Sequence, residues 1–309
     1  GRTPTDRMPA GEESRAFFTA SSGKKLIVLG AGSFAHFLIG FLLIFTIFFG
    51  LGYTALLSNI AQVTPNSAAA EAGFRVRDKI IEVDGKKVKD WYLDSRKIAE
   101  SQGKQMRFTI DREGEILTLS ATPQYLQDQK RDVLCVVTKI GSKRESFYPA
   151  ITASAKATAT LTKESVKSLF ALPSKVPQLI RQTFMGEERN PDGLVGIVGA
   201  ARVSGDAVSS QKLNSNERVT TFILIVASLN IFVGLFNLLP FLPLDGGHMA
   251  IAIADEFRAL FARIRKQPRP AGIDVNVMTP ITMAVFGVLA VLTLILLVAD
   301  IINPISLNF

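Results

Sequence analysis

The sequence predicts a polytopic α-helical membrane protein with three transmembrane helices and an inserted α+β domain. Two observations lead to this prediction. First, three apolar runs each reach the length of about 20 residues that a transmembrane helix needs, namely Leu26–Gly52, Val219–Leu244 and Ile281–Ile302. Second, the segment between the first two runs has an ordinary globular composition and is long enough for a small domain and a helical annex.

The overall composition supports a membrane protein and argues against binding of nucleic acid. Of the 309 residues, 48% are hydrophobic, and the formal net charge is +8. The basic residues mostly flank the apolar runs or are scattered among acids, so they do not form a nucleic-acid-binding surface. Cys135 is the only cysteine, which excludes a disulfide within the chain.

The short connections predict the orientation in the lipid bilayer. Lys24 and Lys25 precede the first apolar run. The loop between the second and third runs is also basic, with Arg258, Arg263, Arg265, Lys266 and Arg269. By the positive-inside rule both clusters face the cytoplasm, which places the inserted domain on the extracytoplasmic side.

These patterns predict the order of the parts along the chain. We expect a cytoplasmic loop at 1–24, a transmembrane helix at 25–52, the α+β domain at 53–123, an extracytoplasmic annex at 124–218, a transmembrane helix at 219–244, a cytoplasmic amphipathic helix and basic loop at 245–279, a transmembrane helix at 280–302 and an outer tail at 303–309. Residues 1–24 are polar and lack a signal-peptide pattern, so we also expect the chain to be a fragment of a longer protein.

Short alternating segments predict the secondary structure of the inserted domain. They comprise strands at Ile60–Val63, Lys79–Val83, Lys86–Val88, Met106–Arg112 and Glu115–Ala121, and a helix at Tyr92–Ser101. Asp84-Gly85 marks a tight hairpin. In the annex we expect an amphipathic helix at Tyr148–Phe170, ended by Leu172-Pro173, and a second segment at Val176–Met185 along the membrane surface.

The inserted domain resembles the bacterial PDZ domain. The resemblance rests on Val63–Phe74 followed by Asp78–Gly85, with Arg77 where a Gly is usual. PDZ domains bind extended chain ends as an added strand, which implies a groove lined by Ile60, Val63 and Ile98. The alternative is a steric plug that limits access to the membrane without gripping a peptide.

The end of the second apolar run carries polar residues where the membrane makes them costly. Asn237, Pro240, Pro243 and Asp245 interrupt or follow the run, which implies a water-filled cavity at membrane depth. Asp245 could be a metal ligand. Taken alone, its position favours a cap for a helix at Met249–Arg265, whose apolar positions Ile253, Phe257, Leu260 and Ile264 recur at helical spacing.

The first run contains small residues and one ionisable residue. Gly30-Ala31-Gly32-Ser33 would let another helix approach closely. His36 is the one ionisable residue inside this run, and such a residue is a functional candidate by default. The more ordinary interpretation is a neutral imidazole that is hydrogen-bonded to a neighbouring helix.

The stretch Asn237–His248 closely resembles the Leu-Asp-Gly signature of the site-2 protease family, the membrane-embedded zinc metalloproteases of intramembrane proteolysis. The resemblance implies that Asp245 is a ligand of Zn²⁺ and that Asn237, Pro240 and Pro243 shape the substrate path. It also implies substrates that are single-span membrane proteins similar to anti-sigma factors, and a location in the bacterial cell membrane. One departure is His36, where the family commonly has Asn.

The family's other zinc ligands and general base belong to a His-Glu-x-x-His helix, which this sequence lacks. His36 and His248 are the only histidines. We therefore expect the C-terminal portion of a zinc metalloendopeptidase, inactive by itself. The alternative is a non-catalytic membrane scaffold that carries a PDZ domain.

Overall fold

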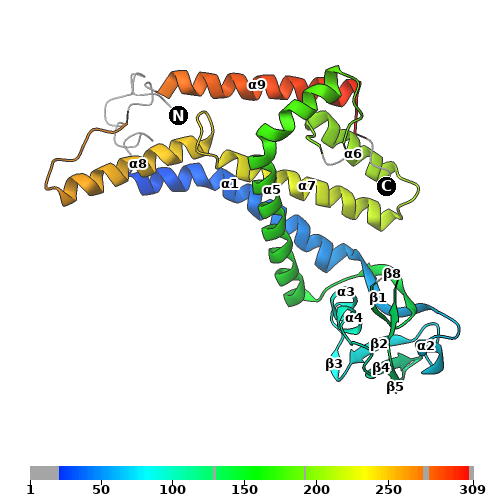
Figure 1. Ribbon diagram of the computed structural model, residues 1–309. Helices are drawn as coiled ribbons and strands as arrows, with labels where there is room; N and C mark the ends of the chain where they lie inside the picture. Colours follow the sequence, from blue (N-terminus) through cyan, green and yellow to red (C-terminus); the bar gives the residue numbers. More distant parts are fainter. Residues whose placement is uncertain (1–20, 128–129, 191–192, 274–277, 306–309) are drawn as a thin grey trace. The chain divides into compact units, whose positions relative to one another are not determined.

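The computed structural model describes residues 21–127, 130–190, 193–273 and 278–305. These residues form two compact units (Figure 1). The β unit is Gly52–Arg144, and the helical unit consists of the described residues before and after it. Most of the loop predicted at 1–24 and of the tail predicted at 303–309 lies outside the described residues.

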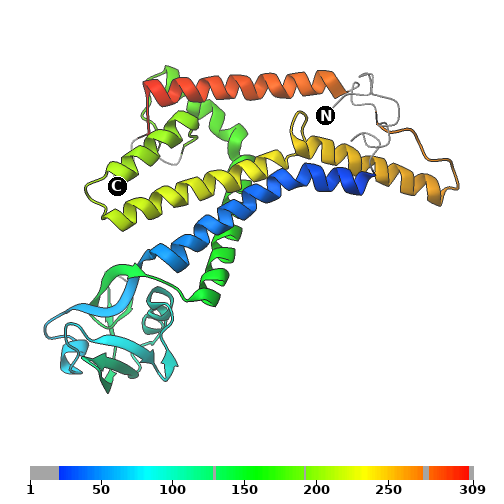
Figure 2. The same cartoon turned by 180° about the vertical axis from the view of Figure 1, so that it is seen from behind.

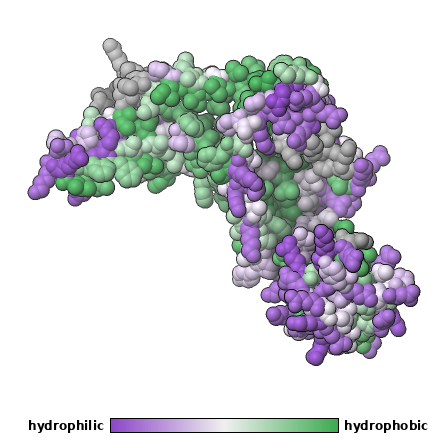
Figure 3. Space-filling model, viewed as in Figure 1, coloured by the Kyte–Doolittle hydropathy of each residue, from purple (hydrophilic) through white to green (hydrophobic). Residues whose placement is uncertain are grey.

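Three helices of the helical unit are long and apolar enough to cross a membrane, which confirms the predicted fold class. They are α1 (Ser22–Phe45), which continues as a π-helix at Thr46–Leu51, α7 (Ser215–Asn237) and α9 (Thr279–Ile302). Helices suit these runs because a helix satisfies its backbone hydrogen bonds within the segment. On the face that Figure 3 shows, much of the helical unit is hydrophobic, whereas the β unit is largely hydrophilic.

α7 and α8 (Asp245–Ile264) lie end to end along α1 (Figures 1 and 2). Small residues permit this close packing. A Cβ added to Gly40 of α1 would lie 2.7 Å from Ile231 Cγ1, and one added to Gly234 of α7 would lie 2.9 Å from His36 Cβ. The junction between α7 and α8 therefore faces the middle of α1.

The annex contains one long helix where two segments were predicted. α5 runs from Phe147 to Phe184 and includes Pro173 and Pro177, so the prediction that Leu172-Pro173 ends the helix is wrong. Prolines four residues apart share one face of a helix. The opposite face keeps its backbone hydrogen bonds, which lets the helix continue past both prolines. α5 packs against α1, α7 and α9.

α9 is held at its C-terminal end by α5 and by α6 (Ile197–Ser209). Arg189 Nη2 lies 3.2 Å from Asp300 Oδ1, and both side chains are almost fully buried. The other carboxylate oxygen of Asp300 accepts a hydrogen bond of 2.7 Å from Gly199 N–H, in the first turn of α6. A Cβ on Gly196 or on Gly199 would come within 2.6–2.8 Å of this carboxylate, so glycine at both positions lets α6 approach it.

The β unit is an antiparallel sheet with the strand order β5-β4-β2-β1-β8. These strands are β1 (Tyr53–Val63), β2 (Lys79–Val83), β4 (Met106–Arg112), β5 (Glu115–Ala121) and β8 (Val136–Lys143). β3 (Lys86–Lys87) pairs with β2, and β6 (Gln124–Leu126) pairs with β7 (Arg131–Val133). The helices are short: α2 (Ala68–Glu71), α3 (Trp91–Asp94) and α4 (Arg96–Ala99), the last two replacing the single helix predicted at Tyr92–Ser101.

The compact β unit extends past the domain boundary predicted at residue 123. β8 pairs with β1 along its length, from Tyr53 opposite Lys143 to Val63 opposite Val136. This pairing brings residues 124–144 into the unit. The predicted hairpin at Asp84-Gly85 joins β2 to β3, and both turn residues have positive φ, as a two-residue hairpin loop requires.

A buried ion pair supports the loop before β2. Arg112 donates hydrogen bonds of 2.8 Å to both oxygens of Asp78, and Asp78 also accepts from Arg75 N–H at 2.8 Å. Arg77, which replaces the usual Gly, has a φ of 77°. Glycine adopts that conformation without steric cost, so the sequence departure noted above falls on a backbone position that favours glycine.

Candidate functional site

The candidate site is the break between α7 and α8. α7 ends at Asn237, and Leu238–Leu244 form an irregular segment before α8 begins at Asp245. The segment folds tightly, because Phe241 N–H donates to Leu239 O at 2.7 Å and Leu244 N–H donates to Phe241 O at 2.9 Å. The apolar helix α7 and the amphipathic helix α8 are thus joined by non-helical backbone.

Two glycines allow the break to fold back on the first turn of α8. A Cβ on Gly246 would collide with the carbonyl oxygens of Leu238 and Leu239, and one on Gly247 would lie 2.6 Å from Leu242 N. Real Cβ atoms do not approach backbone so closely. The Gly246-Gly247 pair therefore fixes where Asp245 enters the helix.

Asp245 is the first residue of α8 and not its cap. The N-cap position belongs to Leu244, and no side chain makes a capping hydrogen bond there. The Asp245 side chain is half-buried and makes no hydrogen bond or ion pair with any other described residue. The structure thus gives no support to the capping alternative, and the carboxylate lies at the positive end of the helix dipole.

α1 passes directly beside Asp245. A Cβ on Gly32 would lie 4.0 Å from Asp245 Oδ2, and one on Gly30 would lie 3.8 Å from Met249 Cε. The sequence marks these glycines only as small residues, because a contact between segments so far apart along the chain has no local signal. Glycine on this face leaves space next to the carboxylate.

The other residues predicted for the substrate path lie in the same segment. Asn237 is the last residue of α7 and is half-buried, while Pro240 and Pro243 are exposed in the break. The break therefore brings Asn237, Pro240, Pro243 and Asp245 together, as their closeness in the sequence requires.

His36 joins α1 to α7. Its Nδ1 lies 3.1 Å from Asn230 Oδ1, and Asn230 Nδ2 donates to Val226 O at 2.9 Å. Because an amide oxygen only accepts, His36 Nδ1 carries a proton in this arrangement. This geometry matches the interpretation of His36 as a contact between helices.

Asp245 could supply one ligand to a metal ion, since carboxylate oxygen is a normal ligand of zinc. Within the described ranges, no three side chains of His, Cys, Asp or Glu gather closely enough to hold a metal. Among the residues that the structure describes, Asp245 thus offers one ligand for a zinc site.

The residues predicted to line a PDZ groove are largely buried in the β unit. Ile60 and Ile98 are 2% and 4% exposed and belong to the hydrophobic core, with Val63 packed partly against it. Along Ile60–Val63, β1 is paired with Val136–Thr138 of β8. β8 is the outer strand instead, with Val137 and Ile140 more than half exposed, and no other described strand covers its outer edge.

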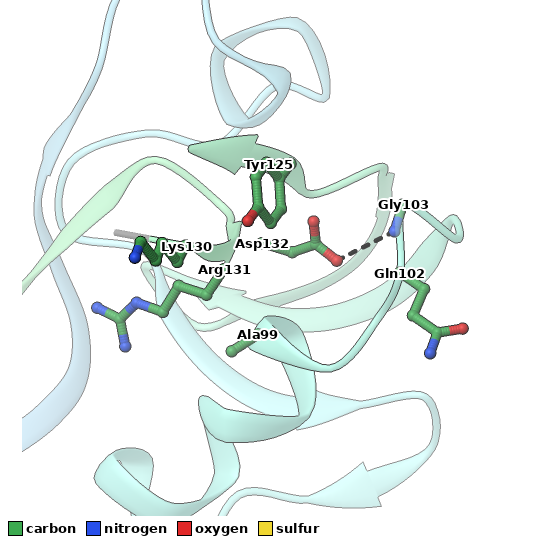
Figure 4. Close-up of a pocket in the computed structure, with 7 residues that line it drawn as sticks. All are labelled: Ala99, Gln102, Gly103, Tyr125, Lys130, Arg131 and Asp132. Carbon is green, nitrogen blue, oxygen red and sulfur yellow. Dashed lines mark hydrogen bonds between the residues drawn. The ribbon is translucent and has the colours of Figure 1, made fainter. Parts of the chain in front are cut away.

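A hollow of about 400 Å³ lies on the β unit near Asp132 (Figure 4). The Asp132 carboxylate accepts hydrogen bonds of 3.1 Å from Ser101 Oγ and from Gly103 N–H. These bonds hold the turn after α4. None of the predicted site residues lines this hollow.

Comparison with known proteins gives matches along most of the chain. The family model described as peptidase family M50 matches residues 6–279 of this chain. Zinc metalloprotease Rip1 of Mycobacterium tuberculosis is 27% identical over 99% of this chain and 82% of its own length. A putative zinc metalloprotease of Mesorhizobium japonicum is 30% identical over 77% of this chain and 63% of its own length.

Two further matches cover shorter parts. The probable protease eep of Enterococcus faecalis is 27% identical over 78% of this chain and 53% of its own length. Among solved structures, the PDZ domain of an SdrC-like protein from Listeria innocua is 14% identical over 26% of this chain and 92% of its own length, with a TM-score of 0.25.

Proposed function

The chain belongs to peptidase family M50, and we propose that it takes part in intramembrane proteolysis as a zinc metalloprotease of membrane proteins. The family predicted from the Leu-Asp-Gly stretch is thereby confirmed. The observation that carries the proposal is Asp245, a carboxylate without a partner among the described residues, at the break between the apolar helix α7 and the amphipathic helix α8. An ionisable group is costly in such a place, and for that reason it marks a functional site.

Asp245 would be one protein ligand of Zn²⁺. When bound, zinc would lower the pKa of its water and polarise the scissile carbonyl. The printed sequence has no His-Glu-x-x-His, so we propose that the histidine ligands and the general base come from outside these 309 residues. The part of this chain would be to hold one carboxylate in a fixed place, through Gly246 and Gly247.

The break would also receive the substrate. A transmembrane helix must unwind before its peptide bonds can be cut, and its freed backbone groups then need partners. The irregular backbone around Pro240 and Pro243, together with the Asn237 amide, could provide them close to Asp245. This role agrees with the exposure of both prolines.

The β unit would act as a PDZ domain on the extracytoplasmic side of the bacterial cell membrane. The basic residues next to α1 and after α8 support this orientation. A peptide end would add to the outer edge of β8, near Val137 and Ile140, and not to β1. Substrates would be single-span proteins similar to anti-sigma factors that have already been trimmed outside.

The test compares Asp245→Ala with Asp206→Ala in the complete protein. Asp206 is a half-buried Asp on α6, so its replacement controls for loss of a carboxylate elsewhere in the helical unit. We expect Asp245→Ala to lose bound zinc, measured by elemental analysis, and cleavage of a single-span substrate in membranes. Asp206→Ala should keep both.

The outcomes separate three cases. Normal zinc content with lost cleavage would remove Asp245 from the metal site. Normal zinc content with normal cleavage would leave it only a favourable charge at the helix terminus. If the wild-type protein holds no zinc and cuts nothing, the alternative of a PDZ-bearing scaffold is correct.

A further inference from the structure

The second half of α8 turns its large apolar side chains outward. The exposed fractions are 42% for Ile253, 57% for Phe257, 52% for Leu260, 60% for Phe261 and 68% for Ile264. By contrast, Ala252 and Ala262 are 7% and 9% exposed and face the protein. This is the reverse of a helix in a water-soluble protein, where large apolar residues face inward.

The five exposed side chains form one stripe. At about 100° of rotation per residue, they fall within an arc of roughly 100° around the helix. Taking about 200 Å² for each large side chain, the stripe exposes on the order of 500 Å² of apolar surface, as much as the largest patch on a typical soluble monomer. A surface of this kind requires an apolar neighbour.

Basic residues flank the stripe. Arg258 and Arg265 lie along one edge of it. Arg263 lies along the other edge together with Glu256, whose carboxylate is paired with Arg269 Nη2 at 2.9 Å. All three flanking arginines are exposed. Arg258 Nη1 is 3.4 Å from Asp255 Oδ1, but Arg263 and Arg265 make no ion pair with a described residue. Apolar side chains bordered by arginines on both edges suit the boundary between lipid tails and phosphate groups.

We propose that the last turns of α8, Phe257–Ile264, bind the surface of the bilayer and prefer anionic phospholipids. In the sequence α8 lies between two helices that can cross the membrane, since α7 ends at Asn237 and α9 begins at Thr279. Its apolar stripe is therefore tethered beside the bilayer on both sides. The positive charge of the flanking arginines complements anionic headgroups.

Binding of α8 to lipid would also affect the position of Asp245, a point that rests on the proposed function. Phe257–Ile264 follows Asp245 at a distance of roughly 18–29 Å along a helix with a rise of about 1.5 Å per residue. Binding of this segment to the headgroup layer would set how deeply the proposed zinc ligand lies in the membrane. The lipid surface would thus help to determine which bond of a substrate meets the site.

The test uses the full chain with Cys135→Ser, reconstituted in nanodiscs of phosphatidylcholine alone or of phosphatidylcholine mixed with phosphatidylglycerol. A single cysteine replaces Phe261 in one variant and Ala259 in the other, and each carries an environment-sensitive fluorophore. Ala259 lies on a different face of the same helix and is half-buried. Lipids with a nitroxide near the headgroup serve as the quencher.

We expect at least twofold stronger quenching at Phe261→Cys than at Ala259→Cys. Quenching at Phe261→Cys should be stronger still in the nanodiscs that contain phosphatidylglycerol. The triple variant Arg258→Gln, Arg263→Gln, Arg265→Gln should lose that increase. Equal quenching at the two sites would overturn the proposal. Disulfide formation between unlabelled Phe261→Cys chains would also overturn it, because it indicates a second copy on the stripe. Because quenching does not depend on cleavage, an Asp245→Ala background separates failure of this inference from failure of the proposed protease.

Discussion

Loss of the Asp300 carboxylate should destabilise the helical unit more than any single surface change. In Asp300→Ala, Arg189 keeps its charge in a site where its side chain is 2% exposed, and Gly199 N–H loses its acceptor. Removal of one partner from a buried ion pair typically costs about 3–5 kcal/mol, because the other charge stays buried without compensation. The orphaned Gly199 N–H adds about 1–3 kcal/mol.

The double variant Arg189→Met, Asp300→Ala discriminates an ion pair from simple packing. It removes both charges, so the penalty for an isolated buried charge disappears. We expect the double variant to be less destabilised than the sum of the two single variants by about 2 kcal/mol, a value within the range of about 0.5–3 kcal/mol for residues in direct contact. Arg189→Met alone should also lower the stability of the helical unit, because it leaves the Asp300 carboxylate buried without its positively charged partner.

Unfolding in detergent micelles, followed by circular dichroism, measures these differences. Trp91 is the only tryptophan and lies 5% exposed in the core of the β unit, so its fluorescence reports that unit alone. The helical transition should shift while the Trp91 transition stays in place. Strictly additive single effects, or equal shifts of both transitions, would refute the reasoning.

Two further predictions concern other parts of the chain. Burial opposes ionisation of Asp78, but the hydrogen bonds from Arg112 and Arg75 N–H outweigh it and hold the pKa of Asp78 below the ordinary value of a carboxyl group. The stabilising contribution of Asp78 is therefore complete above the unfolded carboxyl pKa of about 3.9, and it is lost as the pH falls through the pKa of Asp78 in the folded protein. Arg112→Met should accordingly unfold at a higher pH than the wild type when acid unfolding is followed by Trp91 fluorescence. Gly246→Ala should displace the break and lower the melting temperature, while Gly23→Ala, where an added Cβ meets nothing within 4 Å, should leave it unchanged or slightly raised.

Local features of the sequence predicted the three apolar helices and the position of Asp245 at a helix break. Apolar runs and the order of Pro, Asp and Gly are properties of neighbouring residues, so they can be read without tertiary information. The π-helical end of α1 and the passage of α5 through Pro173 depend instead on packing against other helices. The rule that proline ends a helix failed because α5 loses hydrogen bonds on one face only.

Long-range pairing was the main feature that sequence could not supply. β8 lies far from β1 along the chain, and its pairing moves the end of the β unit to Arg144. The same pairing moves the free sheet edge from Ile60–Val63 to β8. For α8, the helical spacing of Phe257, Leu260 and Ile264 was visible in the sequence, but not that these residues face outward.

The position of Asp245 within its helix leaves its carboxylate available to the proposed cation. At an N-cap, one carboxylate oxygen would accept a hydrogen bond from a backbone N–H of the first turn and would be less available to a ligand. One residue later, the side chain still gains about 0.3–1 kcal/mol from the helix dipole but is not drawn into a capping bond. Leu244 takes the cap position without a side-chain acceptor, and Gly246 and Gly247 keep the chain from shifting by one residue, because any other residue there would collide with Leu238–Leu242. The order Leu-Asp-Gly-Gly therefore gives up a capping bond and leaves the carboxylate free for a ligand.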